Sequence, residues 1–143
     1  MGNIIKHRDF LIVNKQAHQG VFIFTFKAAL PPNTISFNLG LLLGKKMFDA
    51  KTDNQEITIK TALESLLNDN DGNIFFENTD VLFYPEYGLD VIKFLLQVGR
   101  NRKLYLIWPG AVTETRLTYS ELCRFDFKEY NIKDYVDTYV VLR

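Results

Sequence analysis

Apolar residues in this chain gather into short runs separated by polar stretches. Val21–Phe26 and Ile35–Asn38 are rich in aromatic and β-branched residues, which favour strands. Ile74–Phe76 and Leu104–Trp108 are continuous apolar runs, as expected of parallel strands that are buried on both faces. Tyr139–Leu142 ends the chain with a further predicted strand.

Between these runs the apolar positions recur every three or four residues, which is the spacing of an amphipathic helix. Leu39–Phe48 is one predicted helix, and Asp53 stands where the N-cap of the next is expected. A third helix is expected after Pro85, ending at Gly99. Phe10–Val13 is too short to assign to either type. The alternation predicts an α/β fold: a small, mostly parallel sheet with helices on both faces.

Composition indicates one globular domain, residues 1–143, because 47% of the residues are apolar and 14% are aromatic. Lys plus Arg and Asp plus Glu both number 17, so no strong basic field attracts nucleic acid. Cys123 is the single cysteine, and His7 and His18 lack the paired spacing of a metal site. No apolar run approaches the ~20 residues of a membrane span. We therefore expect a cytoplasmic protein with no metal, no cofactor and no membrane contact.

A phosphate-binding loop is missing from the sequence. The nearest match, Gly40–Lys46, has three residues between its glycines where four are needed, and Lys46 replaces the hydroxyl that binds magnesium. Only Lys27–Thr34 separates the first two predicted strands, whereas a parallel crossover uses about a dozen residues or more, generally with a helix. No helix that could hold phosphate is expected there.

Glu77 and Asn78 follow a predicted strand, at the position where an NTPase holds its magnesium ligand. A carboxylate at a strand end is not a site by itself, so we interpret this pair as a vestigial Walker B-like element. Arg100 and Arg102 flank the predicted end of a helix, where cations are favoured by the helix dipole. They are also candidates for a phosphate or partner contact. Trp108 is expected to be a packing anchor.

Phe22 and Phe24 lie on the first predicted strand, which has no helix after it to cover its face. Either the N-terminal segment Ile4–Val13 or the aromatic tail Phe125–Tyr139 covers this face, or it stays open. Because monomers rarely leave large apolar patches exposed, we predict that Phe22 and Phe24 form an interaction face in a homo-oligomer or an obligate complex.

The second half of the chain resembles a known family. The segments that carry the resemblance are Asn73–Glu86, Leu95–Arg102, Ile107–Gly110 and Arg116–Tyr119, with Ile35–Leu39 before them. In order and spacing they resemble the BrxF family, the small P-loop-fold proteins of type III BREX phage-defence systems. The resemblance implies a reduced P-loop NTPase-like, three-layer domain that works beside other defence-system proteins, including a large ATPase and a methyltransferase.

The resemblance carries over Glu77, Arg100 and Arg102 but not nucleotide hydrolysis, because the P-loop is missing. We therefore expect a non-catalytic assembly or regulatory subunit of a bacterial anti-phage complex, not an enzyme. Two alternatives stay open. One is an NTPase completed in trans by a partner chain. The other is a nucleic-acid-binding module, with weak or indirect DNA contact, that uses scattered basic residues: Arg100, Arg102, Lys103 and Lys45-Lys46.

Overall fold

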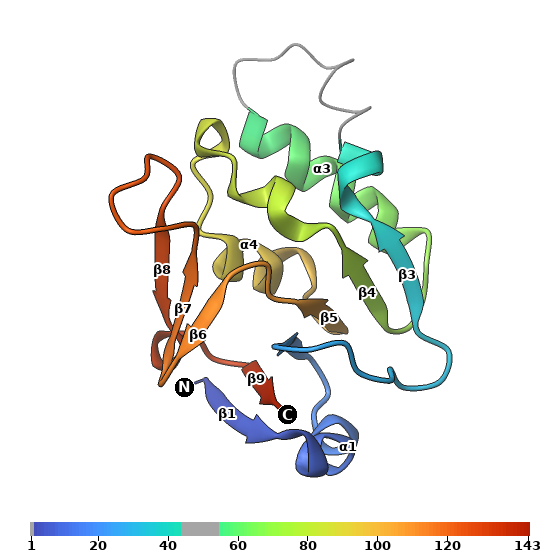
Figure 1. Ribbon diagram of the computed structural model, residues 1–143. Coiled ribbons are helices and arrows are strands. Elements are labelled where there is room, and N and C mark those ends of the chain that lie inside the picture. The colour runs from blue at the N-terminus through green and yellow to red at the C-terminus, as the bar shows by residue number, and fades with distance from the viewer. Residues whose placement is uncertain (1, 44–54) are drawn as a thin grey trace.

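The computed structural model describes residues 2–43 and 55–143 (Figure 1). Within these ranges the chain forms a six-stranded sheet, in the order β1-β9-β2-β5-β4-β3, in which every neighbouring pair is parallel. A three-stranded antiparallel sheet, β6-β7-β8, stands beside it. The strands are β1 (Asn3–Lys6), β2 (Gly20–Phe24), β3 (Ile35–Asn38), β4 (Ile74–Glu77), β5 (Lys103–Ile107), β6 (Ala111–Thr113), β7 (Arg116–Tyr119), β8 (Lys128–Asn131) and β9 (Thr138–Leu142).

Helices pack on both faces of the main sheet. One apolar cluster joins α1 to one face, and a second joins α3 and α4 to the other. The predicted α/β fold with a mostly parallel sheet is therefore confirmed. Residues 39–43 are also helical, and Lys45-Lys46 and the predicted N-cap Asp53 lie outside the described residues. The other helices are α1 (His7–Gln16), α3 (Gln55–Asn68), α4 (Val91–Val98) and the short 3-10 helices η1 (Thr79–Phe83), η2 (Pro85–Tyr87) and η3 (Ile132–Asp134).

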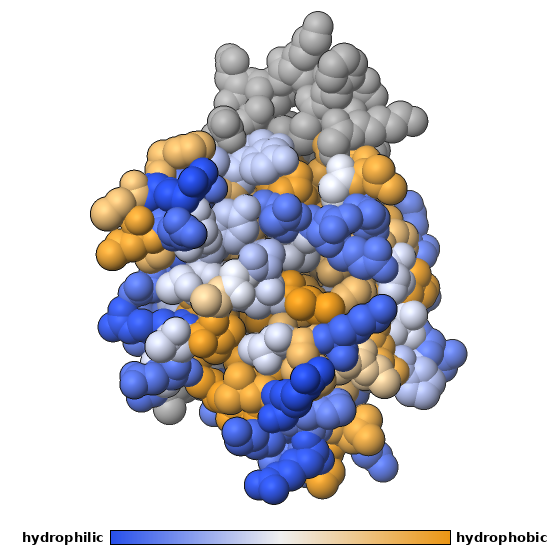
Figure 2. Space-filling view, in the orientation of Figure 1, coloured by the Kyte–Doolittle hydropathy of each residue, from blue (hydrophilic) through white to orange (hydrophobic). Residues whose placement is uncertain are grey.

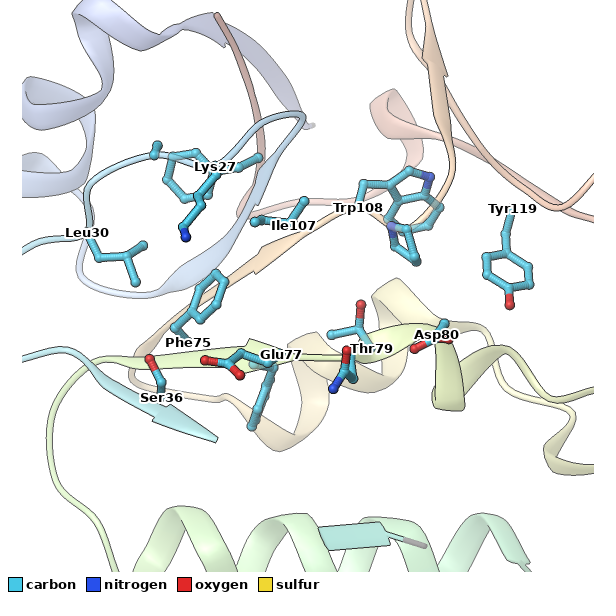
Figure 3. A pocket seen from close by; sticks show the side chains of 15 residues that line it. Lys27, Leu30, Ser36, Phe75, Glu77, Thr79, Asp80, Ile107, Trp108 and Tyr119 are labelled. Carbon is cyan, nitrogen blue, oxygen red and sulfur yellow. The ribbon is translucent and has the colours of Figure 1, made fainter. Parts of the chain in front are cut away.

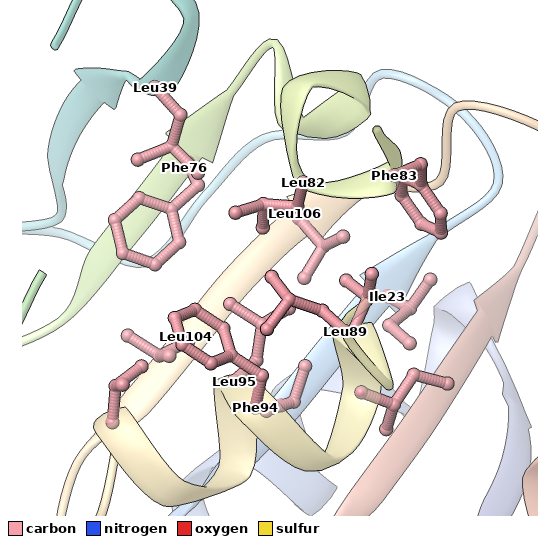
Figure 4. Packing of buried hydrophobic residues seen from close by; sticks show 14 of the residues in the cluster. Ile23, Leu39, Phe76, Leu82, Phe83, Leu89, Phe94, Leu95, Leu104 and Leu106 are labelled. Carbon is pink, nitrogen blue, oxygen red and sulfur yellow. The ribbon is translucent and has the colours of Figure 1, made fainter. Parts of the chain in front are cut away.

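The larger core lies between the sheet and α4 (Figure 4). Alternate residues of the central strands, such as Ile23 of β2 and Leu104 of β5, point toward α4 and are fully buried. The helix begins where the Asp90 carboxylate accepts a hydrogen bond from the Lys93 N–H at 3.1 Å. It ends at Gly99, whose N–H donates to the Leu95 carbonyl, so the predicted C-terminal cap is confirmed.

Helix α1 covers the opposite face of β2. Phe22 and Phe24 are 0% and 1% exposed, and both rings meet Phe10 of α1 edge to face, at 5.6 and 5.0 Å. Phe22 also stacks on Tyr139 of β9 at 4.7 Å. The prediction of an open interaction face at Phe22 and Phe24 is therefore wrong. The N-terminal segment, through α1, covers this face.

Polar contacts hold the end of α1 against the sheet. The Tyr105 hydroxyl donates to Oδ1 of Asn14 at 2.5 Å, and the Lys103 ammonium donates to the main-chain carbonyl of Asn14. Burial raises the pKa of Tyr105 to about 12, although the hydrogen bond to Asn14 opposes this shift. The phenol is therefore protonated at neutral pH and remains the donor.

Residues 25–34 connect β2 to β3 without a helix. This confirms that no P-loop helix follows the first core strand, but the two strands are nonetheless parallel members of one sheet. Their separation of three strand spacings is roughly 14 Å, whereas ten extended residues can span about 33 Å. The segment crosses the α1 side of the sheet, where Ala28 and Leu30, like Phe75, pack against the smaller core.

The strands of the antiparallel sheet lie between β5 and β9 in the chain. This sheet is joined to the main core through Trp108, the single tryptophan, whose Nε1 donates to the Thr118 carbonyl at 2.9 Å. The indole also meets Phe83 and Tyr130 edge to face. Trp108 is 5% exposed, which confirms its prediction as a packing anchor.

Candidate functional site

A pocket of about 780 Å³ opens where β2, β4 and β5 end. The carboxyl edge of a parallel sheet is where ligands bind in open α/β folds, and sites for small molecules occupy roughly 300–1,000 Å³. Position and size therefore agree with a ligand site.

One side of the pocket is apolar. Phe24 ends β2, Phe75 belongs to β4, Ile107 ends β5, and Trp108 follows it. Leu30 reaches the same pocket from the β2–β3 connection, which passes over this part of the sheet. This helix-free connection thus leaves room for a cavity and lines it with aliphatic carbon.

The other side carries acids on a turn. β4 ends at Glu77, and Asn78 has φ of 55°, a left-handed conformation that asparagine adopts more readily than most residues. The chain then enters η1, so Glu77 and Asp80 line the same wall (Figure 3). Thr79, between them, is buried. In the part of the chain that the structure describes, neither carboxylate has a hydrogen bond or an ion pair.

Tyr119 closes the pocket beside Asp80 (Figure 3). Its ring stacks on Phe83 with centroids 4.2 Å apart, which fixes its position. Burial raises the pKa of the Tyr119 phenol, and the negative charges of Asp80 and Asp126 raise it further. The hydroxyl is therefore uncharged at neutral pH.

Lys27 is the one cation among the described lining residues. It comes from the β2–β3 connection, and Figure 3 shows Lys27 and Glu77 on opposite sides of the Phe75 ring. No ion pair joins Lys27 to either acid among the described residues. With two carboxylates against one ammonium, the pocket has an excess of negative charge.

The structure separates the predicted site residues. Glu77 and Asn78 line the pocket, but Arg100 and Arg102 precede β5 and lie at the amino edge of the sheet. The Arg102 guanidinium donates to the main-chain carbonyls of Leu67 at 2.8 Å and Asn70 at 2.7 Å, at the end of α3. Arg100 is exposed. The geometry therefore gives no joint phosphate site for Glu77 and these arginines.

Two of the basic residues proposed for nucleic-acid contact, Arg102 and Lys103, make hydrogen bonds within the described structure. Arg102 donates to main-chain carbonyls at the end of α3. Lys103 donates to the main-chain carbonyl of Asn14 and so holds α1 in place. Arg100 alone of these three has no such bond among the described residues.

Sequence reasoning missed Lys27, Asp80 and Tyr119 as pocket residues. Asp80 had a signal, since it follows a predicted strand end and lies three residues after Glu77. Lys27 lies in a segment without periodicity, and Tyr119 belongs to the second sheet. Their approach to the pocket depends on the topology, which the local pattern does not contain.

The fold and the pocket define a class: an α/β domain with a parallel sheet and a ligand-sized pocket at its carboxyl edge. Compared with known proteins, the chain matches no protein-family model, no curated protein and no solved structure. No group of three or more His, Cys, Asp or Glu side chains suited to a metal occurs among the described residues. None of the described helices has the length and apolar character needed to cross a membrane.

Proposed function

We propose that the chain is a non-catalytic assembly or regulatory subunit of a bacterial anti-phage defence complex, built on a reduced P-loop NTPase-like domain. The resemblance of Asn73–Tyr119 to BrxF proteins supports the defence role, and the parallel sheet with layers on both faces is compatible with that family's fold. The observation that carries the non-catalytic part is the connection after β2, residues 25–34, which has no helix.

Triphosphate binding in P-loop proteins uses backbone N–H groups at the start of the helix that follows the first core strand. Here the segment at that place, residues 25–34, has no helix. At the same edge, Glu77 and Asp80 face the pocket without ion-pair partners among the described residues. Their charge repels a triphosphate, so binding and hydrolysis of ATP are both disfavoured.

Other surfaces remain for partner proteins, since α1 covers Phe22 and Phe24. The loop between β7 and β8 exposes Leu122 and Phe125, and α1 exposes Leu11 and Ile12. Figure 2 shows apolar atoms at the β7–β8 loop beside charged ones. These side chains suit contacts with a large ATPase or with another defence protein.

The defence role predicts a loss of protection when the gene is deleted. In a host that carries the chain with its neighbouring genes, deletion should raise the plaque count of a restricted phage by orders of magnitude. Plasmid-borne wild-type chain should restore resistance. Protection that is unchanged after deletion would contradict the proposal. A neighbourhood that encodes a large ATPase and a methyltransferase would support it.

The non-catalytic role predicts that the isolated chain does not bind ATP with magnesium at physiological concentrations. The connection after β2, residues 25–34, has no helix whose N–H groups could hold the phosphates, and the pocket acids oppose them. Isothermal titration calorimetry with ATP and magnesium should give no saturable heat. An affinity in the micromolar range would reject this part of the proposal and favour an NTPase completed by a partner chain.

A further inference from the structure

We propose that the pocket at the carboxyl edge binds an organic cation, a guanidinium or ammonium group on an apolar stem. The cation lies against the wall that carries Glu77 and Asp80, and the stem lies against Phe75 and Ile107. This site does not depend on membership of a defence complex.

The first argument is charge. Glu77 and Asp80 are exposed to the pocket, and neither has an ion pair or a hydrogen bond within the described ranges. A bound cation would gain charge-assisted hydrogen bonds from carboxylates that no side chain of the described structure already neutralises. Tyr119, uncharged beside Asp80, offers the face or edge of a ring and a hydroxyl to the same group.

The second argument is shape. A site of about 780 Å³ exceeds what a metal ion or a single ammonium ion needs, and its other wall is aromatic and aliphatic. Phe24, which ends β2, and Trp108, which follows β5, are buried and packed against other rings, so this wall is preorganised. A ligand with an apolar stem buries that surface, whereas a bare ion leaves it wet.

The third argument is the position of Lys27. Its ammonium lines the pocket away from the acid wall, across the Phe75 ring (Figure 3). A second positive charge at the far end of a ligand would approach Lys27. The pocket therefore favours a monocation over a polyamine. Two sources supply such a group: a free small molecule, or an arginine or lysine side chain of a partner protein.

The test is an NMR titration of the ¹⁵N-labelled chain with n-butylguanidinium. We expect saturable shifts of the amides at Glu77–Asp80 and Tyr119, and none with 1-butanol or butyrate. Agmatine, which adds a second positive charge, should bind more weakly. N-acetyl-arginine methylamide distinguishes the sources. Tighter binding than n-butylguanidinium assigns the site to a partner's side chain, and weaker binding assigns it to a free cation.

Variants make the test specific. Asp80→Asn keeps the shape and should weaken binding about tenfold, the value of one charge-assisted hydrogen bond. Lys27→Gln should tighten binding severalfold because it removes the opposing charge. Asp71→Asn is the matched control: it lies in the turn before β4, at the other edge of the sheet, and should leave affinity unchanged. The Trp108 emission spectrum confirms that each variant is folded.

Three outcomes would overturn the proposal. One is the absence of a saturable shift up to about 10 mM, far above a useful affinity. Another is binding of butanol that is equal to that of the cation, which would make the pocket merely apolar. The last is preferential binding of butyrate, lost in Lys27→Gln, which would assign the pocket to an anion.

Discussion

Replacing Phe22 with Ala is expected to lower the free energy of unfolding by about 3–5 kcal/mol, the range for a buried phenylalanine. Phe22 is 0% exposed and lies between α1 and the sheet. The substitution removes its stacking on Tyr139 and its edge contact with Phe10. It also leaves a cavity at the centre of the smaller core, where α1 and β9 cannot both move in to fill it.

Denaturant unfolding followed by Trp108 fluorescence measures this change. Phe125→Ala is the matched control, because it is the same substitution at a side chain that is 83% exposed in the β7–β8 loop. We expect the control to stay within about 0.5 kcal/mol of the wild type. Equal small losses for both variants would mean that α1 does not cover β2. The open face expected from the sequence would then return.

The central strands β2 and β5 could be predicted from the sequence because they are buried on both faces, and the partly exposed edge strand β3 because its residues favour strands. Val21–Phe26, Ile35–Asn38 and Leu104–Trp108 match β2, β3 and β5 to within two residues at each end. A continuous apolar run in a short segment leaves few alternatives to a buried strand. The α3 and α4 helices could be predicted from the periodicity of their apolar residues, because each buries a single apolar stripe against the sheet.

The N-terminal segment could not be predicted in the same way. α1 buries Phe10 and Asn14 while Leu11 and Ile12 stay exposed, so its apolar residues do not mark one face. β1 is an edge strand of four residues that pairs with β9, which lies at the other end of the sequence. That pairing is non-local, and no local pattern contains it. The sequence therefore left three alternatives for the face at Phe22: the N-terminal segment, the aromatic tail or no cover. The structure places α1 there.

The residues of the candidate site also fall into two groups: those that the local sequence could predict and those that only the fold identifies. Glu77 was predicted because a strand end is visible in the sequence, and it does line the pocket. Arg100 and Arg102 were grouped with it through a resemblance, but parallel strands place a residue before β5 and a residue after β4 at opposite edges. Lys27 and Tyr119 arrive from a loop and from the second sheet, so only the fold identifies them.

The second large effect is expected at Gly110, where the chain turns from β5 into the antiparallel sheet. A Cβ atom at this position would lie 1.9 Å from the Thr118 carbonyl oxygen and 3.1 Å from Nε1 of Trp108. These two atoms form the hydrogen bond from Trp108 to Thr118 that joins the antiparallel sheet to the main core. Because the nearest atom belongs to the backbone of β7, it cannot rotate away as a flexible side chain would.

Gly110→Ala should therefore destabilise the chain by about 3 kcal/mol, the upper part of the range for overpacking. It should also shift the native emission of Trp108 to longer wavelength, since the indole loses its carbonyl partner and opens toward the pocket. Gly72→Ala provides the comparison, because its φ of +95° disfavours alanine but the space around it is open. It should cost about 1–2 kcal/mol without changing the emission spectrum. An unchanged Trp108 spectrum in Gly110→Ala would show that the second sheet moves freely relative to β5, and the pocket wall at Trp108 and Tyr119 would then not be rigid.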